Sequence, residues 1–153
     1  MMLERSRDAA FLNRVLNDPA VLPWATLGAN MPLDMTLVLA DEANIFLANQ
    51  HGGFLLVPHG QHIYSIHVQF LKSGRGPLIL KLGRQALWYA FTQTDCLQVD
   101  TSVAHDNRVA ARLAEAAGFE KWDDVEIRGV PSSYYVLTLK KWARSLSCQQ
   151  AQP

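Results

Sequence analysis

The sequence predicts an α/β protein (mixed α+β) in which helices flank a central, mixed and mostly antiparallel twisted sheet. Two observations carry this prediction. Residues 61–119 read as strand, glycine turn, helix, strand and helix, which together form a β-α-β-α unit. Residues 43–57 read as two strands around paired glycines, which favour a hairpin because glycine adopts positive φ at little cost. We therefore expect an antiparallel meander that leads into the β-α-β-α unit.

Length and composition predict a single domain over residues 1–145, followed by a polar tail at 146–153. The chain is 49% hydrophobic and 18% charged, which is typical of a globular protein and not of a disordered one. Basic and acidic residues number 14 each, so the formal net charge is zero. A neutral chain offers no electrostatic case for nucleic acid or an anionic membrane as a partner, and it favours self-association, for instance as a homodimer.

The sequence also gives an expectation for the cellular compartment of the protein. The N-terminus lacks the long apolar stretch of a signal peptide, and no run approaches the length of a membrane span. The two cysteines are Cys96, in a predicted buried strand, and Cys148, in the polar tail; they do not make a disulfide framework. We expect a soluble cytoplasmic protein in a reducing environment.

The chain is predicted to begin with a short strand, residues 1–4, and a helix over residues 7–16. Ser6 is the expected N-cap of this helix. The helix is expected to end before Pro19, because proline disfavours helical backbone in the residue that precedes it. Residues 20–32 read as irregular, and residues 33–40 are ambiguous between helix and strand.

The β-α-β-α unit begins with a strand at residues 61–70, after a turn at residues 58–60. The first helix is predicted over residues 78–91. It begins well, because Pro77 in its first turn loses no hydrogen bond that the helix needs. Apolar residues recur on one face of this helix at helical spacing: Leu78, Ile79, Leu82, Ala86, Leu87 and Ala90.

The second half of the unit is a strand at residues 96–100 and a helix at residues 104–117, for which Gly118 is a good left-handed C-cap. The residues expected to face inward from this helix are Val109, Ala110, Leu113 and Ala117. Two strands follow, at residues 119–130 and 133–139. The last strand is apolar on both faces, as expected for a strand inside a covered sheet.

The glycine loop at residues 71–77 is the clearest candidate for a binding site. Glycine lets the backbone approach a phosphate, and the first amides of the following helix are unpaired and carry partial positive charge. Lys72 and Arg75 add two cations. The alternative is a plain basic turn between a strand and a helix.

Residues 61–119 resemble the core of the GNAT acyl-CoA N-acetyltransferases. In that family a splayed strand leads into an Arg/Gln-x-x-Gly-x-Gly/Ala loop that binds the pyrophosphate of acetyl-CoA, and a later helix carries Asn-x-x-Ala-x-x-Leu-Tyr-x-x-x-Gly-Phe. The loop here is residues 71–76, Leu-Lys-Ser-Gly-Arg-Gly. The residues that match the later motif, with every spacing kept, are Asn107, Ala110, Leu113, Gly118 and Phe119.

The resemblance implies a GNAT-like fold with a splayed strand pair at the cofactor site, and acetyl-CoA as the cofactor. It implies transfer of an acetyl group to an unidentified primary amine, of a small molecule or a peptide, by direct attack on the thioester. The cofactor-binding residues that it implies are Val68, Phe70, Lys72, Ser73, Gly74, Arg75, Gly76, Pro77 and Asn107. Asn107 has a second interpretation, as a helix N-cap. In the family, residues 20–32 would line the acceptor side, where Trp24 is either a substrate-side aromatic or a packed one.

Acetyl transfer requires a group that deprotonates the acceptor ammonium, and neutral histidine near pH 7 suits this task. The strand at residues 61–70 carries no Asp or Glu. The candidates are therefore His62, His67, or a water ordered by Tyr64 or Ser65. His62 and His67 stand at odd spacing on one predicted strand and point to opposite faces, so we expect no metal site.

Two residues depart from the family pattern. Leu71 stands where Arg or Gln is usual, and Ala114 stands where many members have the tyrosine that protonates the departing thiolate. Tyr134 or Tyr135 could reach the cleft from the last strand, although core packing is the other interpretation. These departures support a second hypothesis, a catalytically silent GNAT-like domain that serves as a structural or binding module. The chain also resembles small GNAT-like proteins of phage genomes, some of which are virion components.

Overall fold

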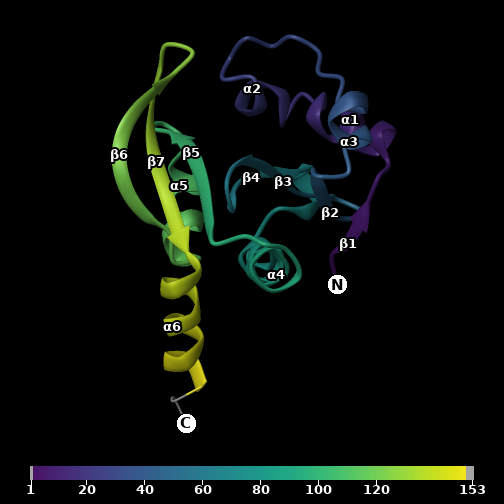
Figure 1. Cartoon of the computed structure of the whole chain (residues 1–153). Coiled ribbons are helices and arrows are strands. Elements are labelled where there is room, and N and C mark those ends of the chain that lie inside the picture. The colour runs from purple at the N-terminus through teal and green to yellow at the C-terminus, as the bar shows by residue number, and fades with distance from the viewer. Residues whose placement is uncertain (1, 151–153) are drawn as a thin grey trace.

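The computed structural model describes residues 2–150, and within them a single seven-stranded sheet in the order β1-β2-β3-β4-β5-β7-β6 (Figure 1). The strands are β1 Glu4–Ser6, β2 Ile45–Asn49, β3 Gly52–Gly60, β4 Ile63–Phe70, β5 Gln98–Ala104, β6 Glu120–Ile127 and β7 Val130–Thr138. Neighbouring strands pair antiparallel except β4 and β5, which run parallel. This order puts the β-α-β-α unit, β4 to α5, in the middle of the sheet.

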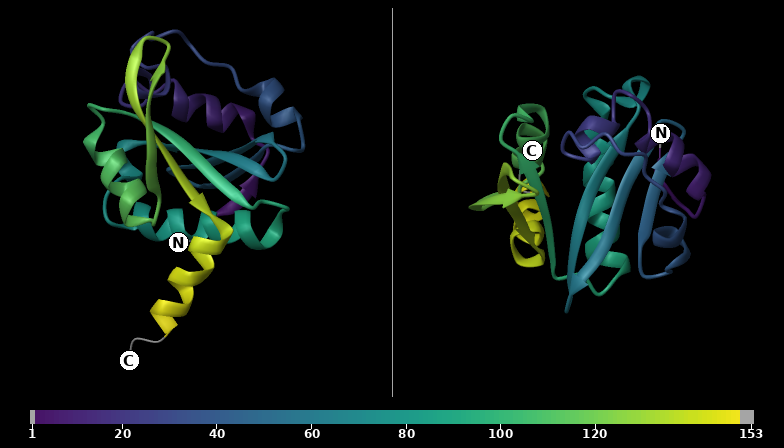
Figure 2. Two further views of the ribbon diagram at one scale, coloured as in Figure 1. Left: turned by 60° about the vertical axis from the view of Figure 1, so that its left-hand side comes forward. Right: turned by 90° about the horizontal axis from the view of Figure 1, so that it is seen from above.

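Helices cover both faces of the sheet. They are α1 Ala9–Leu16, α2 Leu22–Ala25, α3 Thr36–Ala40, α4 Leu78–Gln93, α5 Arg108–Ala116 and α6 Leu139–Gln150. Residues of α4 and α5 pack with one face of the sheet in the larger apolar cluster, and α1 and α3 pack with the other face in a second cluster. Figure 2 shows these two layers, and Figure 1 shows α6 extending away from the rest of the molecule. No described helix is long and apolar enough to cross a membrane.

The parallel pair β4–β5 is short. Its registered pairs are Ile63 with Gln98, Tyr64 with Val99 and Ser65 with Asp100. Within the described chain, no residue of β4 after Ser65 is registered with β5. The two strands start side by side and then diverge, which Figure 2 (right) shows as a V.

Several predicted boundaries were wrong because strand pairing reaches further than local signals indicate. Ser6 is paired with Phe46 in β1–β2, so it does not cap α1; Asp8 does, accepting a hydrogen bond from the Phe11 amide at 2.9 Å. Residues 58–60 belong to β3, which carries a bulge there, and the turn follows at His62 with φ of 64°. Strand pairing with β7 likewise extends β5 to Ala104.

The phase of α5 also differs from the prediction. Val109 is 79% exposed, and Ala114 is the buried residue of this helix. In the predicted polar tail, residues 146–150 continue helix α6. The domain boundary at residue 145 stays a prediction. The side chain of Cys148 and residues 151–153 lie outside the described part of the structure.

Replacing Gly83 by alanine is expected to stabilise the protein by roughly 0.5–1 kcal/mol, because glycine inside a helix carries an excess entropy cost. Gly83 is buried in the middle of α4, and an added Cβ would lie 3.7 Å from carbons of the Phe54 ring, an ordinary van der Waals distance. Urea unfolding of the two proteins measures the difference. A destabilised alanine variant would show that the helix–sheet contact at Phe54 is tighter than this geometry.

Candidate functional site

The V between β4 and β5 opens at the end of β4 that leads into α4. The exposure of the β4 side chains marks the open part. Ile66, Val68 and Phe70 alternate onto the same face of the strand. Ile66 and Phe70 are 5% and 3% exposed, whereas Val68 between them is 41% exposed. An exposed valine between two buried neighbours marks the open part of the cleft. A ligand lying along the strand would cover this side chain.

The glycine loop stands at the open end of β4. Residues Lys72–Gly74 form a short 3₁₀ turn, in which the Gly74 amide donates to Leu71 O (2.9 Å) and the Arg75 amide to Lys72 O (3.2 Å). Those two amides are therefore not free for an anion. Gly76 has φ of 130°, and nothing lies within 4 Å of where its Cβ would be. No side chain caps the first turn of α4. An anion would meet Gly76 and the start of α4.

Gly74 has a packing role. A Cβ at Gly74 would lie 2.4 Å from the Cβ of His51, in the turn between β2 and β3. The Nδ1 atom of His51 lies 2.9 Å from Ser73 Oγ, and His51 O accepts the Leu71 amide at 2.9 Å. These contacts fix the loop against the neighbouring turn. They account for Gly74 and Ser73 without a ligand.

The two cations of the loop differ. Arg75 donates from Nε to Phe70 O (3.1 Å) and from Nη2 to Ala20 O (2.9 Å). The Lys72 side chain is exposed, and in the described part of the chain its ammonium has no hydrogen bond or ion pair. Lys72 is therefore the loop cation that remains available to an anion.

Asn107 caps α5, because its Oδ1 accepts a hydrogen bond from the Ala110 amide at 3.2 Å. Among the described residues none accepts from its Nδ2 group, so this amide can still donate to a ligand. Ala114, two turns further along α5, is 7% exposed and packs in the larger apolar cluster. Helix α5 consequently presents no hydroxyl at this position.

His62 and Tyr64 lie at the closed end of the V. His62 Nδ1 is 3.0 Å from Asp95 O and 3.2 Å from Asp95 Oδ2, and the Tyr64 hydroxyl donates to Asp95 Oδ1 at 3.0 Å. Burial, followed by the hydrogen bond to Asp95, raises the pKa of Tyr64. These contacts tie the start of β4 to the connection between α4 and β5. They do not bring His62 and Tyr64 together with His67.

His67 lies in the diverging part of β4. Its register partner is Leu55, which packs in the cluster under α1 and α3, so His67 faces those helices. No hydrogen-bond partner of its ring exists among the described residues. Although the ring keeps contact with solvent, the surrounding protein removes part of its hydration and lowers its pKa below the ordinary 6.5. The Asp100 carboxylate opposes this shift, and His59 adds to it.

Asp100 is the residue that the sequence analysis missed. It is 3% exposed and lies at the last registered pair before the strands diverge. Its carboxylate accepts hydrogen bonds from Ser65 Oγ (2.6 Å), Tyr134 OH (2.7 Å) and His59 Nε2 (2.7 Å). Burial, followed by the bond to Asp100, raises the pKa of Tyr134 to about 12, so its hydroxyl stays protonated.

Asp100 escaped the sequence analysis for a physical reason. Its three partners come from β3, β4 and β7, and they stand 34 to 41 residues away from it along the chain. The only local signal was a lone carboxylate in an apolar strand, which must be satisfied if it is buried. That signal indicates a partnered Asp100, but it cannot name the partners.

The remaining candidates lie elsewhere. Tyr135 is on the opposite face of β7 from Tyr134 and donates to Glu115 Oε1 of α5 at 3.1 Å. Cys96 is 1% exposed, and burial raises the pKa of its thiol to about 11, so it is not a nucleophile. Trp24 is 49% exposed. The described residues hold no group of three side chains suited to a metal ion.

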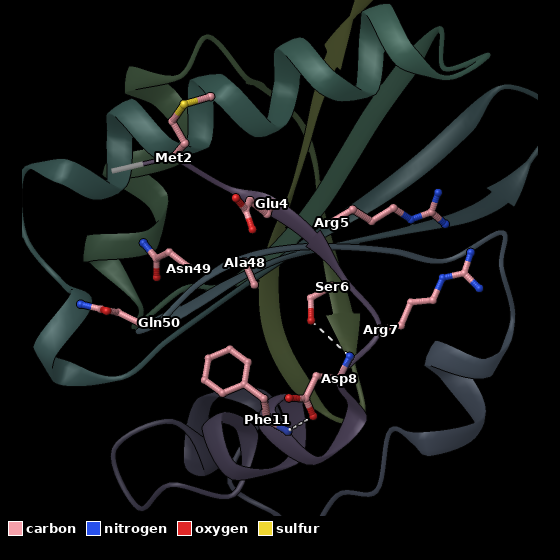
Figure 3. A pocket seen from close by; sticks show the side chains of 10 residues that line it. All are labelled: Met2, Glu4, Arg5, Ser6, Arg7, Asp8, Phe11, Ala48, Asn49 and Gln50. Atoms are coloured by element: carbon pink, nitrogen blue, oxygen red, sulfur yellow. Dashed lines mark hydrogen bonds between the residues drawn. The ribbon is translucent and has the colours of Figure 1, made fainter.

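Hollows at two places on the described surface bear on where a ligand could lie. The larger, of about 650 Å³, lies around the edge strand β1 and away from the V (Figure 3). Its two arginines are already engaged by Glu42, Arg5 through the backbone carbonyl (2.8 Å) and Arg7 through the carboxylate (3.0 Å). The second hollow, of about 590 Å³, lies between the glycine loop and the segment that carries Trp24. Of the two, this second hollow is the one that adjoins the glycine loop.

Comparison with known proteins identifies the fold. No protein-family model matches the chain, and no curated protein matches it in sequence. Solved structures do match: aminoglycoside acetyltransferase AAC(6')-Ib in complex with coenzyme A and kanamycin has a TM-score of 0.74 at 22% identity, covering 95% of this chain and 98% of that one. Spermidine N-acetyltransferase from Vibrio cholerae in complex with CoA and spermine has a TM-score of 0.77 at 16% identity, covering 93% and 97%. The chain has the GNAT fold.

The GNAT fold confirms the predicted α/β class, the mixed and mostly antiparallel sheet with flanking helices, and the splayed strand pair. It does not test the individual site residues. The structure, and not the sequence analysis, shows the hydrogen bonds that join Asp100 to His59, Ser65 and Tyr134. We call these four residues the Asp100 cluster.

Proposed function

We propose that this protein is an acetyl-CoA-dependent N-acetyltransferase that acts on a primary amine of a small molecule or peptide. The observation that carries the proposal is the open V between β4 and β5, with a glycine loop and an uncapped helix start at its mouth. The similar solved structures support it, since they were determined with coenzyme A and with aminoglycosides or spermine. The acetyl thioester of the cofactor supplies an activated acyl group.

Binding follows from the backbone. After Ser65, the edge of β4 that faces β5 has no registered partner in the described chain, so its amides and carbonyls can pair with the amides of a pantetheine arm. Val68 would pack against that arm. Gly76, the first turn of α4 and Lys72 would hold the pyrophosphate. Asn107 Nδ2 offers one further donor. An amide of β4 directed at the thioester carbonyl would stabilise the charge that develops on its oxygen.

The acceptor amine would approach from the α1 face, where His67 and the Asp100 cluster lie. His67, neutral because of its lowered pKa, accepts the proton of the acceptor ammonium. The amine nitrogen then forms the new C–N bond as the C–S bond breaks. The nitrogen, which is positively charged once the C–N bond has formed, loses its second proton to water. The departing thiolate takes a proton from His67 or from water, because Ala114 offers no hydroxyl. Asp100 keeps His59 and Tyr134 in fixed orientations beside this path.

A pH profile tests the role of His67. The rate should rise with pH as the imidazolium loses its proton, and the acidic limb of kcat/KM should lie below pH 6.5, because the pKa of His67 is lowered in the fold. His67→Gln should remove this limb and reduce kcat/KM by roughly 100-fold, the typical contribution of a general base. His62→Gln is the matched control and should leave the profile unchanged. If the acidic limb of kcat/KM persists in His67→Gln, a group other than His67 is the general base.

The second candidate function is a GNAT-like binding or structural module without turnover. The buried Ala114 favours it, since it provides no acid in α5. One experiment separates the two functions: calorimetric titration with acetyl-CoA, followed by an assay of thiol release with spermine, kanamycin and a peptide with a free amine. Binding with turnover supports the enzyme, and binding without turnover on every amine supports the module. A homodimer and a cytoplasmic location stay predictions.

A further inference from the structure

The arch, defined as residues 18–32, is the segment that α2 belongs to, and it is closed at its base. Asn17 Nδ2 donates to Leu33 O, and the Leu33 amide donates to Asn17 Oδ1, both at 2.7 Å. Figure 1 shows the arch beside α1 and α3, on the side of the sheet away from α4. One side-chain amide therefore joins both ends of the arch. Between these ends, the position of the arch over the sheet depends on the contacts that its own residues make.

Those contacts are few. Helix α2 has no buried residue, and Trp24 and Met31 are 49% and 68% exposed. Val21 is buried in the cluster under α1, and Thr26 is buried but its hydroxyl bonds only within the arch, to Leu22 O and the Asn30 amide. A segment with so little buried apolar surface has a low free energy of local opening.

Arg75 provides the link between the arch and the glycine loop. Across the described chain, its bond to Ala20 O is the sole hydrogen bond that joins the arch to any residue outside 13–35. The same guanidinium donates through Nε to Phe70 O, the last residue of β4. The planar guanidinium holds its N–H groups in a fixed fork, so the two bonds set Ala20 relative to Phe70. A lysine cannot reproduce this, because its ammonium is one point on a flexible stem.

We propose that Arg75 is a positioning residue that couples the glycine loop to the arch. Its guanidinium spans from the end of β4 to Ala20, along the hollow of about 590 Å³ that both segments line. Occupation of the glycine loop stiffens this bridge and orders the arch. The arch is thereby held more firmly over the acceptor side when the cofactor is bound than in the free protein. The coupling to the cofactor rests on the proposed function; the bridge itself does not.

Hydrogen exchange read by mass spectrometry tests the bridge in the free protein. In Arg75→Lys, which keeps the charge but not the fork, amides of residues 19–30 should exchange about tenfold faster than in the wild type, as expected for a weakly held segment. Lys72→Gln is the matched control, since Lys72 lies in the same loop and holds no partner among the described residues; it should leave the arch unchanged. Equal exchange in the arch of Arg75→Lys and wild type overturns the proposal.

Coenzyme A then tests the coupling. Saturating coenzyme A should slow exchange of residues 19–30 in the wild type, whereas Arg75→Lys should bind coenzyme A within about threefold of the wild-type Kd yet gain little protection in the arch. The proposal fails if Arg75→Lys weakens the binding of coenzyme A more than Lys72→Gln does, while residues 19–30 still gain protection from exchange. In that case Arg75 is a phosphate ligand. A wild type that binds no coenzyme A refutes the proposed function, and the free-protein exchange still decides whether the bridge exists.

Discussion

Gly76→Glu is expected to weaken acetyl-CoA binding at least ~100-fold, because the new carboxylate would stand where the phosphates should meet the start of α4. The position itself is open, with nothing within 4 Å of an added Cβ, so the side chain would project into that space rather than into the protein. The φ of 130° also strains any residue other than glycine, at a cost of roughly 1–3 kcal/mol. Calorimetric titration with acetyl-CoA measures the loss.

Strain must be separated from the loss of the phosphate site, and Gly28→Glu does this. Gly28 also has positive φ (86°) and open space around its Cβ position, so the same substitution adds the same charge and a comparable strain outside the loop. Its affinity for acetyl-CoA should stay within about threefold of the wild type. Gly74→Glu is a poorer probe, since its side chain would collide with His51 and distort the loop by packing alone. If Gly76→Glu binds acetyl-CoA with wild-type affinity, the phosphates of the cofactor do not bind at this loop.

The β-α-β-α unit was predictable because its signals are local. Helical periodicity, Pro77 at the start of α4 and Gly118 after α5 each act within a few residues. Boundaries that depend on partners in distant strands were not predictable. Ser6 has the chemistry of an N-cap, but pairing with Phe46 holds it in β1 and leaves the cap to Asp8.

The candidate site divides in the same way. The glycine loop follows from sequence spacing, yet the structure reassigns its parts: Gly74 packs against His51, Arg75 reaches Ala20, and Gly76 remains the open position. The Asp100 cluster depends on the sheet order β3-β4-β5-β7, which places four strands side by side without any local sequence signal. Only a tertiary arrangement distinguishes Asp100 from Asp95, which lies in the same short stretch of the sequence.

Asp100→Asn is expected to lower turnover about 100-fold through misplacement of the groups around the acceptor. It should also lower the free energy of unfolding by about 2–4 kcal/mol, because a buried carboxylate with three donors is replaced by an amide that cannot accept from all of them. The negative charge of Asp100 raises the pKa of His67, so its removal lowers that pKa further. The acidic limb of kcat/KM should consequently move to lower pH in the variant. Steady-state rates across pH and urea unfolding measure these effects.

Asp95→Asn is the matched control that the chain itself supplies. Asp95 also bonds one histidine and one tyrosine, His62 and Tyr64, but its side chain is 64% exposed and lies at the closed end of the V. Exposed ion pairs contribute about 0–1 kcal/mol, so this variant should lose little stability and keep its turnover and pH profile. The reverse result, with Asp95→Asn inactive and Asp100→Asn active, would place the chemistry at His62 and Tyr64. The two carboxylates have similar partners, so the comparison isolates burial and position at the divergence of β4 and β5 as the features that matter.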